Sequence, residues 1–421
     1  MMKLKHSICC GLDVHKKVIV ATIAITDKNG ISEYKQRAFT TMNSDIQKFR
    51  SWLLENNCHH VCMESTGKYW IPIFNYLEKD INVCLTHPKY VRAIKGKKTD
   101  KKDSKWIADL YKFDLVRTSF IPPEDFRQMR EIARYRFKLV CMRSSERNRV
   151  QNCMTVSNIG IANIFSDPFC KTATDIMAYL MQNTSETIDD KAVKKLIRKN
   201  TKATSDDIID AIKGYKIESD QAKKIELAQN HMDYLDAMIK ETEVELYVRI
   251  KPYYNYVECI SSLPGLTPLS ASIILAEIGV NMDIFESDKH LCSWCGLSPA
   301  NNESAGKKKS VRIAKAGAYL KPLMVQCALA AVKSEKQPYF AIKYRRLRKR
   351  RGHKKAVIAI ARMMMVCIYH MIIRQEAFNP GDFEEVMTPQ EYRPKLNEEI
   401  VFQFLQKQGY DTSVLVKCND N

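Results

Sequence analysis

The sequence lacks two features that would assign it quickly to a class of protein. Its first residues, MMKLKHSICC, have no long apolar region behind the lysines, which argues against a secretory leader. Its 14 cysteines are scattered, and neither Cys58 with Cys62 nor Cys292 with Cys295 has the second pair that a structural zinc site needs. We therefore expect free thiols in a reducing cytoplasm, behaving as small buried hydrophobes.

Acidic residues are scarce relative to basic ones. The chain has 67 Lys and Arg against 48 Asp and Glu, a formal net charge of +19. Proteins with such an excess of positive charge usually bind polyphosphates. Nucleic acid is therefore the first expected partner, and a membrane surface is the second. The length of 421 residues allows two or three domains, and the hydrophobic content of 45% is typical of soluble globular proteins.

The chain also lacks an uninterrupted membrane-spanning run near its C-terminus. AVIAIARMMMVCIYHMIIR, from residue 356, resembles an anchor behind a basic flank. However, Arg362 and His370 interrupt it, and a central arginine is costly in a bilayer. We expect a buried helix here and no membrane partner.

The N-terminal third has the pattern of an α/β domain. Three strands come first, followed by helix, strand, helix, strand and helix, which suits a layered fold with a mixed sheet. The expected strands are 7–13, 18–25, 33–39, 59–65 and 81–87. The expected helices are 43–54, a segment through IPIFNYLE, and one that begins near Asp100.

Four acids in this region are candidate metal ligands. Asp13 and Glu64 end the first and fourth strands, and active sites of such sheets gather at strand ends. Asp100 and Asp103 lie on one helix face within a dense run of lysines, KGKKTDKKDSKWIADLY. Converging carboxylates amid positive charge suit a divalent metal that handles phosphate. The alternative is a set of solvated strand and helix ends.

Three motifs carry a resemblance to a known family. GLDVHKK, MESTGKYW and KTDKKDSKWIADL resemble the catalytic blocks of the DEDD insertion-sequence transposases, which are relatives of the Piv-type DNA invertases. The resemblance implies a RuvC-like, ribonuclease-H fold for the N-terminal domain. It also implies that Asp13, Glu64, Asp100 and Asp103 are the catalytic acids and bind Mg²⁺.

A second block, residues 285–324, resembles the transposase domain at the C-terminal side of the same family. The resemblance places the nucleophilic serine at Ser304. Ala305 separates it from Gly306, where relatives often have Gly directly after Ser, so Ser310 is a fallback. A serine hydroxyl needs a base, a metal or a positive field to attack, and the alternative is a serine in a flexible loop. Just before this block, 259–280 predicts a helix-hairpin-helix-like unit that turns at Pro264-Gly265.

The middle of the chain is predicted to be helical. Residues 124–154 form a basic helix, 155–216 indicate short helices without evident chemistry, and 217–250 carry a heptad seam. The seam fits either a helix packed within its own domain or a coiled coil between protomers, and the resemblance favours assembly. The expected domains are 1–154 catalytic, 155–255 helical and coiled-coil, 256–375 transposase, and 376–421 a C-terminal extension.

Several basic residues are expected to contact nucleic-acid backbones. They are Lys97, Lys98, Lys101, Lys102, Arg134, Arg143, Arg147, Lys307, Lys308, Lys309, Arg312, Lys315, Arg345, Arg346 and Arg348. The resemblance implies a recombinase that cuts and rejoins donor and target DNA as a dimer or tetramer, guided by a noncoding RNA. Two alternatives stay open: a structure-specific nuclease that uses water, and a non-catalytic nucleic-acid-binding protein.

Overall fold

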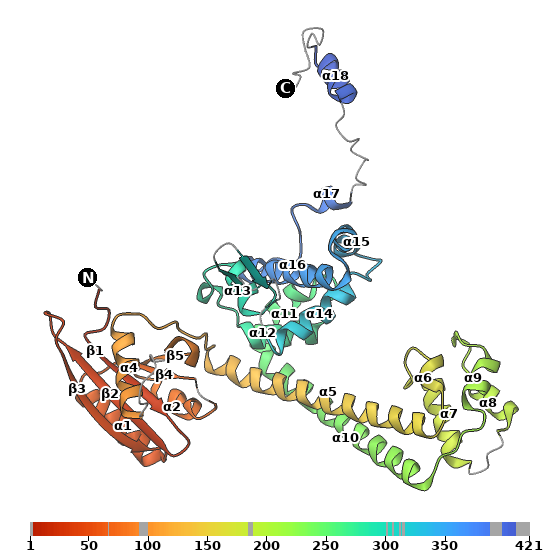
Figure 1. Cartoon of the computed structure of the whole chain (residues 1–421), viewed down its shortest axis with the longest axis horizontal. Helices are drawn as coiled ribbons and strands as arrows, with labels where there is room; N and C mark the ends of the chain where they lie inside the picture. The colour runs from red at the N-terminus through yellow and green to blue at the C-terminus, as the bar shows by residue number, and fades with distance from the viewer. Residues whose placement is uncertain are drawn as a thin grey trace. The chain divides into compact units, whose positions relative to one another are not determined.

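The computed structural model divides into two compact units, Met1–Ala133 and Arg134–Asn421 (Figure 1). The described residues are 3–65, 67–91, 100–183, 188–299, 302–304, 307–310, 313, 316–387 and 398–409. Within these ranges, the side chains of residues 89, 90, 100, 101, 302–304, 307–310 and 398–400 are outside the description.

The N-terminal unit is built on a five-stranded sheet with the order β3-β2-β1-β4-β5. The first three strands form an antiparallel meander, whereas β4 runs parallel to β1 and β5 parallel to β4. The predicted mixed sheet is therefore confirmed. The strands are β1 (Ile8–Val14), β2 (Val18–Thr26), β3 (Ser32–Thr40), β4 (His60–Glu64) and β5 (Asn82–Thr86).

Helices cover both faces of this sheet and bury two apolar cores. One core packs α1 and α2 against Leu12, Ile23 and Met63, and the other packs α4 against Cys62 and Cys84. Burying these aliphatic and aromatic side chains is the main force that holds the layers together. The helices are α1 (Asn43–Glu55), α2 (Trp70–Leu77), α3 (Pro88–Val91) and α4 (Asp100–Lys112).

Most of a long antiparallel helix pair belongs to the second unit (Figure 1). α5 (Glu124–Val156), which begins in the first unit, packs against α10 (Ser219–Ile250). Ion pairs join Arg136 to Glu243 and Arg143 to Asp236, so residue numbers rise along one helix as they fall along the other. Leu235 and Ile239 of the predicted heptad seam pack on Leu139 of α5, so the same chain covers this part of the seam.

A small helical cluster joins the far ends of this pair. It shares one apolar core with the end of α5 and the start of α10. The short helices expected between residues 155 and 216 are therefore present. They are α6 (Ile161–Ile164), α7 (Lys171–Gln182), α8 (Asp190–Leu196) and α9 (Ser205–Ile212).

Several of the remaining helices pack around α16 (His353–Arg374). By length and composition alone α16 could cross a membrane, but half of its most apolar 18-residue stretch is buried inside the protein. It packs against α11, α13, α14 and α15, as expected for a core helix. The helices that follow α10 in this unit, besides α16, are η1 (Lys251–Tyr253), α11 (Tyr254–Ser261), α12 (Pro268–Ile278), η2 (Met282–Ile284), α13 (Asp288–Trp294), α14 (Leu320–Ala331), α15 (Tyr339–Arg351), α17 (Phe383–Met387) and α18 (Glu398–Lys407).

The turn between α11 and α12 depends on Gly265. Its φ is +86°, and an added Cβ would lie 2.4 Å from the carbonyl oxygen of Cys327 on α14. Both the backbone angle and the close approach of α14 require glycine. The two helices and the turn predicted for residues 259–280 are present, and α14 packs directly against the turn.

Candidate active site

Asp13 and Glu64 lie side by side at the ends of two parallel strands. Leu12 of β1 is in register with Met63 of β4, so the acids that follow are also adjacent. Side chains alternate along a strand, and Leu12 and Met63 share the core under α1 and α2. Asp13 and Glu64 therefore face the opposite side of the sheet, which α4 covers.

The direction of α4 brings its first turn to the same edge. Cys9 lies next to the backbone carbonyl of Ala108, with a sulfur–oxygen distance of 3.6 Å. An added Cβ on Gly11 would be 2.2 Å from the carbonyl oxygen of Ser104. Later residues of β1 thus meet earlier residues of α4, and the residues before Ser104 lie towards Asp13. Gly11 makes this close approach possible.

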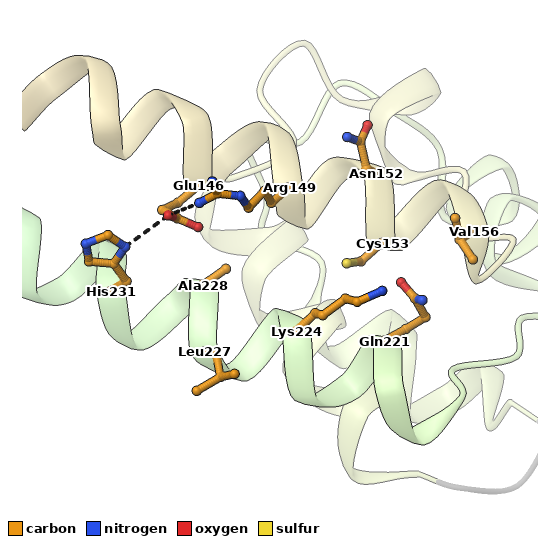
Figure 2. Close-up of a pocket in the computed structure, with 10 residues that line it drawn as sticks. All are labelled: Glu146, Arg149, Asn152, Cys153, Val156, Gln221, Lys224, Leu227, Ala228 and His231. Carbon is orange, nitrogen blue, oxygen red and sulfur yellow. Dashed lines mark hydrogen bonds and ion pairs between the residues drawn. The ribbon is translucent and has the colours of Figure 1, made fainter.

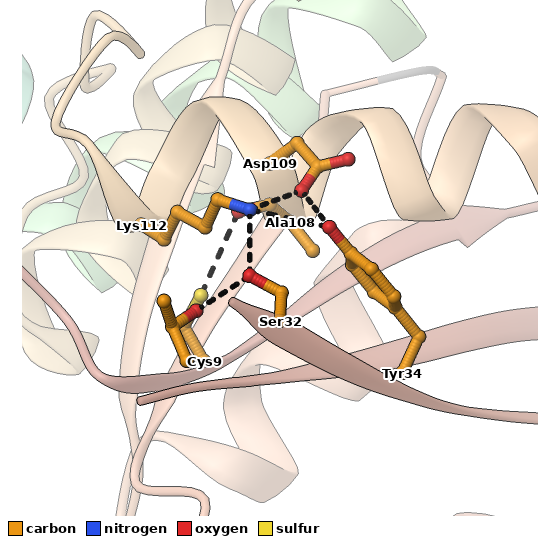
Figure 3. Close-up of polar contacts among 7 residues, drawn as sticks. Cys9, Ser32, Tyr34, Ala108, Asp109 and Lys112 are labelled. Atoms are coloured by element: carbon orange, nitrogen blue, oxygen red, sulfur yellow. Dashed lines mark hydrogen bonds and ion pairs between the residues drawn. The ribbon is translucent and has the colours of Figure 1, made fainter. Parts of the chain in front are cut away.

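The other end of α4 is held by a polar network (Figure 3). The Lys112 ammonium group donates to the Asp109 carboxylate at 2.6 Å and to the Ser32 hydroxyl at 3.1 Å. The Tyr34 hydroxyl donates to the same carboxylate, also at 2.6 Å. These contacts fix α4 to the edge strand β3 and so help to fix the position of its first turn.

The two acids of α4 occupy that first turn. Asp100 is the first residue of the helix, but its side chain is outside the described part of the structure. Asp103 is half-buried and directly precedes Ser104, whose hydroxyl is 2.8 Å from that of Thr22. Among the side chains described, no three acids, histidines or cysteines are grouped closely enough to hold a metal ion. The described side chains of Asp13, Glu64 and Asp103 belong to elements that meet at one edge of the sheet, without forming a ligand shell among themselves.

His15 is a site residue that the sequence reasoning missed. Its Nε2 is 3.3 Å from Oδ2 of Asp13, whose side chain is 17% exposed. His15 is two residues after Asp13 and lies on the same side of the chain. Its backbone N–H donates to the carbonyl oxygen of Val18 in the turn to β2. The available signal was the period-two spacing after a candidate acid.

The four cysteines considered for zinc are buried thiols. Cys58 belongs to the core under α1, whereas Cys62 belongs to the core under α4, so the two face opposite sides of the sheet. Cys292 and Cys295 are both fully buried, and burial raises the pKa of each thiol. Every cysteine within the described ranges is a free thiol.

The backbone places Ser304 in a two-stranded hairpin. Ser304 ends β6 (Asn302–Ser304) and pairs with Lys307, the first residue of β7 (Lys307–Ser310). The structure does not describe the side chains of either strand. The undescribed side chains include those of Ser304, Ser310, Lys307, Lys308 and Lys309. The sequence reasoning treated this stretch as a turn and loop and did not predict the hairpin.

Three arginines expected to bind phosphate have acidic partners within the second unit. Arg134 pairs with Glu277 at 2.7 Å, and Arg143 pairs with Asp236 at 2.7 Å. Arg147 pairs with Asp167 and lies over the Phe169 ring. Glu277 is almost fully buried, so the Arg134 pair contributes to the packing of α5 on α12. Any phosphate would have to compete with these carboxylates.

The structure describes only some of the other basic residues that are expected to contact phosphate. Arg345 and Arg348 of α15 are exposed, whereas Arg346 is half-buried. Lys102 on α4 is exposed, and Lys101 is described only in its backbone. Lys97, Lys98, Arg312 and Lys315 lie outside the described residues.

A cavity of about 500 Å³ lies between α5 and α10 (Figure 2). At one end, buried Glu146 accepts hydrogen bonds from Arg149 and from Nδ1 of His231. The hydrogen bond from Arg149 lowers the pKa of Glu146. Lys224 and Cys153 line the other end. Nothing in the sequence pattern predicted this cavity, because its walls come from residues far apart along the chain.

Comparisons with known proteins point to one enzyme family. A family model described as "Transposase", for DEDD transposases of the IS110 type, matches residues 10–159. A second, "Transposase IS116/IS110/IS902 family", matches residues 257–345. The transposase for insertion sequence element IS1111A of Coxiella burnetii is 27% identical over 125 residues, which are 29% of this chain and 34% of the relative. The match thus spans about a third of that protein's length.

Among solved structures, a Fowlpox virus resolvase in complex with Holliday junction DNA is 18% identical. The match covers 25% of this chain and 72% of that one, with a TM-score of 0.18, which carries no inference about this chain.

Proposed function

Because the chain belongs to the IS110-type family of DEDD transposases, we propose that it moves a mobile DNA element by cutting and rejoining DNA strands. The observation that carries the proposal is the shared edge of Asp13, Glu64 and the first turn of α4. A RuvC-like, ribonuclease-H assignment of the first unit is supported by its antiparallel meander followed by two parallel strands.

The donor set fits a hard divalent cation such as Mg²⁺. All four acids offer carboxylate oxygens, the ligands that Mg²⁺ prefers. In this proposal Asp13, Glu64, Asp100 and Asp103 hold the cation, which when bound neutralises charge on the phosphodiester and on the departing oxygen. His15 orients the Asp13 carboxylate through the contact between them.

Ser304 is the proposed nucleophile. Its Oγ would form a bond to phosphorus while the bond from phosphorus to a deoxyribose oxygen breaks, and that oxygen would take up the proton that the serine hydroxyl gives up. In the second step, a sugar hydroxyl of the other strand would attack the same phosphorus. Its proton would pass to Oγ as the serine leaves, so the bond energy is conserved and rejoining needs no nucleotide cofactor.

The remaining parts of the proposal concern partners. Donor and target DNA would lie along the basic residues of α4, α5, β7 and α15, held chiefly through phosphates. A noncoding guide RNA and a dimer or tetramer are implied by the family resemblance, and the net charge of +19 supports binding of more than one nucleic-acid strand.

Covalent trapping of labelled element-end DNA on a denaturing gel, with Mg²⁺ present, tests the proposal. The wild-type chain should give a protein–DNA adduct, Ser304→Ala should lose it, and Ser310→Ala should keep it. Cleavage without an adduct in both wild type and Ser304→Ala would favour the water-using nuclease. An adduct that survives Ser304→Ala but not Ser310→Ala would move the nucleophile to the second serine.

A further inference from the structure

A short segment that follows α16 packs against α15, the most basic helix. We call residues 378–387 the acidic segment, because it contains Asp382, Glu384 and Glu385 and no basic residue. Its Asp382 carboxylate accepts hydrogen bonds from Lys343 and from the Tyr339 hydroxyl of α15, both at 2.6 Å.

A second contact ties the same helix face to the end of α17. The guanidinium group of Arg346 donates to the backbone carbonyl of Val386 at 3.3 Å. This carbonyl belongs to the last turn of α17, where unpaired carbonyl groups carry partial negative charge. Tyr339, Lys343 and Arg346 follow one another at steps of four and three residues, so they share one face of α15.

The face that the acidic segment covers is suited to phosphate. α15 and the first turn of α16 hold nine basic residues between positions 343 and 355. Arg350 continues the covered face by one further turn and is exposed. The Asp382 carboxylate accepts from Lys343, and the Val386 carbonyl accepts from Arg346. These donors could otherwise bind two phosphate oxygens.

Phe378 holds the start of the segment through ring contacts with Tyr339 and Phe340, whereas the contacts that follow it are partly exposed. The Lys343–Asp382 pair is partly exposed, at 22% and 42%, and exposed pairs contribute little to stability. Phe383 stacks on Tyr339 but stays 44% exposed, and only Val386 of α17 is buried. The segment also lies outside residues 257–345, the range of the second family match.

We propose that the acidic segment occupies a phosphate-binding face of α15 and is displaced when a nucleic-acid backbone binds there. The segment thus limits non-specific binding by the most basic part of the chain. This inference rests on the proposed function, since it assumes that α15 contacts nucleic acid.

The test compares binding of the full chain to a short DNA duplex and to a short RNA over a range of salt concentrations. Asp382→Asn, Glu384→Gln and Glu385→Gln together remove the charge and keep the packing. Removing the carboxylate charge from Lys343 should steepen the slope of log K against log salt by about 1 and tighten binding on the order of tenfold at 0.1 M salt. A gain with only one of the two probes identifies which backbone α15 prefers.

A matched variant controls for net charge. Asp190→Asn, Asp206→Asn and Asp210→Asn add the same charge on exposed positions of α8 and α9. If this control tightens binding as much as the segment variant, the proposal is overturned. Adding Lys343→Ala and Arg346→Ala to the segment variant should remove the gain.

Hydrogen exchange of the wild-type chain gives a readout that does not depend on any variant. The Phe378 amide donates to the Ser262 hydroxyl at 2.8 Å, and the Val386 amide to the Asp382 carbonyl at 3.0 Å. Saturating nucleic acid should speed exchange of both amides. Unchanged exchange at saturation overturns the inference alone, whereas absence of binding by wild type and all variants would overturn the proposed function.

Discussion

The two units use charged residues in different ways. In the first unit, Asp13 and Glu64 end adjacent strands, so strand register alone brings them together. In the second, the arginines of α5 lie on a helix that packs against other helices, and several pair with acids of the same chain. In this chain, strand register brings the charges at strand ends together, whereas helix–helix contacts use the charges along α5.

The largest effect is expected from a substitution that disturbs the contact placing α4 over the strand ends. Gly11→Ala puts a Cβ within 2.4 Å of the Ala108 backbone nitrogen as well as against Ser104. We expect a loss of about 3 kcal/mol in the free energy of unfolding, measured by urea denaturation. Gly30→Ala is the control, because its surroundings are open and only its φ of +83° opposes a side chain, at about 1 kcal/mol. Equal losses would contradict the proposed role of Gly11.

A smaller effect sharpens the contrast between structural and nucleic-acid-binding arginines. Arg134→Ala removes the guanidinium partner of buried Glu277, and we expect a loss of about 2 kcal/mol in unfolding free energy. Arg345→Ala, on exposed α15, should change stability by less than about 0.5 kcal/mol and should weaken DNA binding. If Arg134→Ala weakens DNA binding at unchanged stability, the ion pair is not its main role.

The smallest expected effect concerns the join between β3 and α1. The Thr40 hydroxyl and then Lys48 donate to the Asp45 carboxylate and lower its pKa from 3.8 to about 2. A depressed pKa in the folded state gives stability that is present above pH about 4 and lost as the pH falls towards 2. Asp45→Asn should therefore lower the urea midpoint at pH 6 and leave it near the wild-type value at pH 2. An equal difference at both pH values would contradict this assignment.

Much of the first unit could be predicted because its signals are local. Strand alternation, apolar helix faces and acids at strand ends all lie within a few residues of one another. His15 follows Asp13 at the period-two spacing, but its contact with Asp13 also depends on the turn into β2, which the residue pattern does not specify. The heptad seam of α10 was found, but a seam cannot indicate whether its partner belongs to the same chain, and part of it packs on α5.

Less of the second unit could be predicted, because its contacts join distant segments. The hairpin of β6 and β7 includes KKKS, whose lysines resemble a solvated loop more than a strand. The acidic segment was expected to be a surface extension, and its pairing with α15 depends on residues about 40 positions apart. Such pairings are visible only in the folded structure, because no local residue pattern indicates them.

Binding of Mn²⁺ to the full-length chain tests the central claim most directly, since loss of the free-ion paramagnetic resonance signal reports binding without any DNA. The wild-type chain and an Asp27→Asn control, altered in the turn after β2, should bind alike. Asp13→Asn should weaken binding by at least about tenfold, because it removes a charged ligand from the edge formed by β1, β4 and α4. Equal Mn²⁺ affinity in wild type and Asp13→Asn would contradict the account.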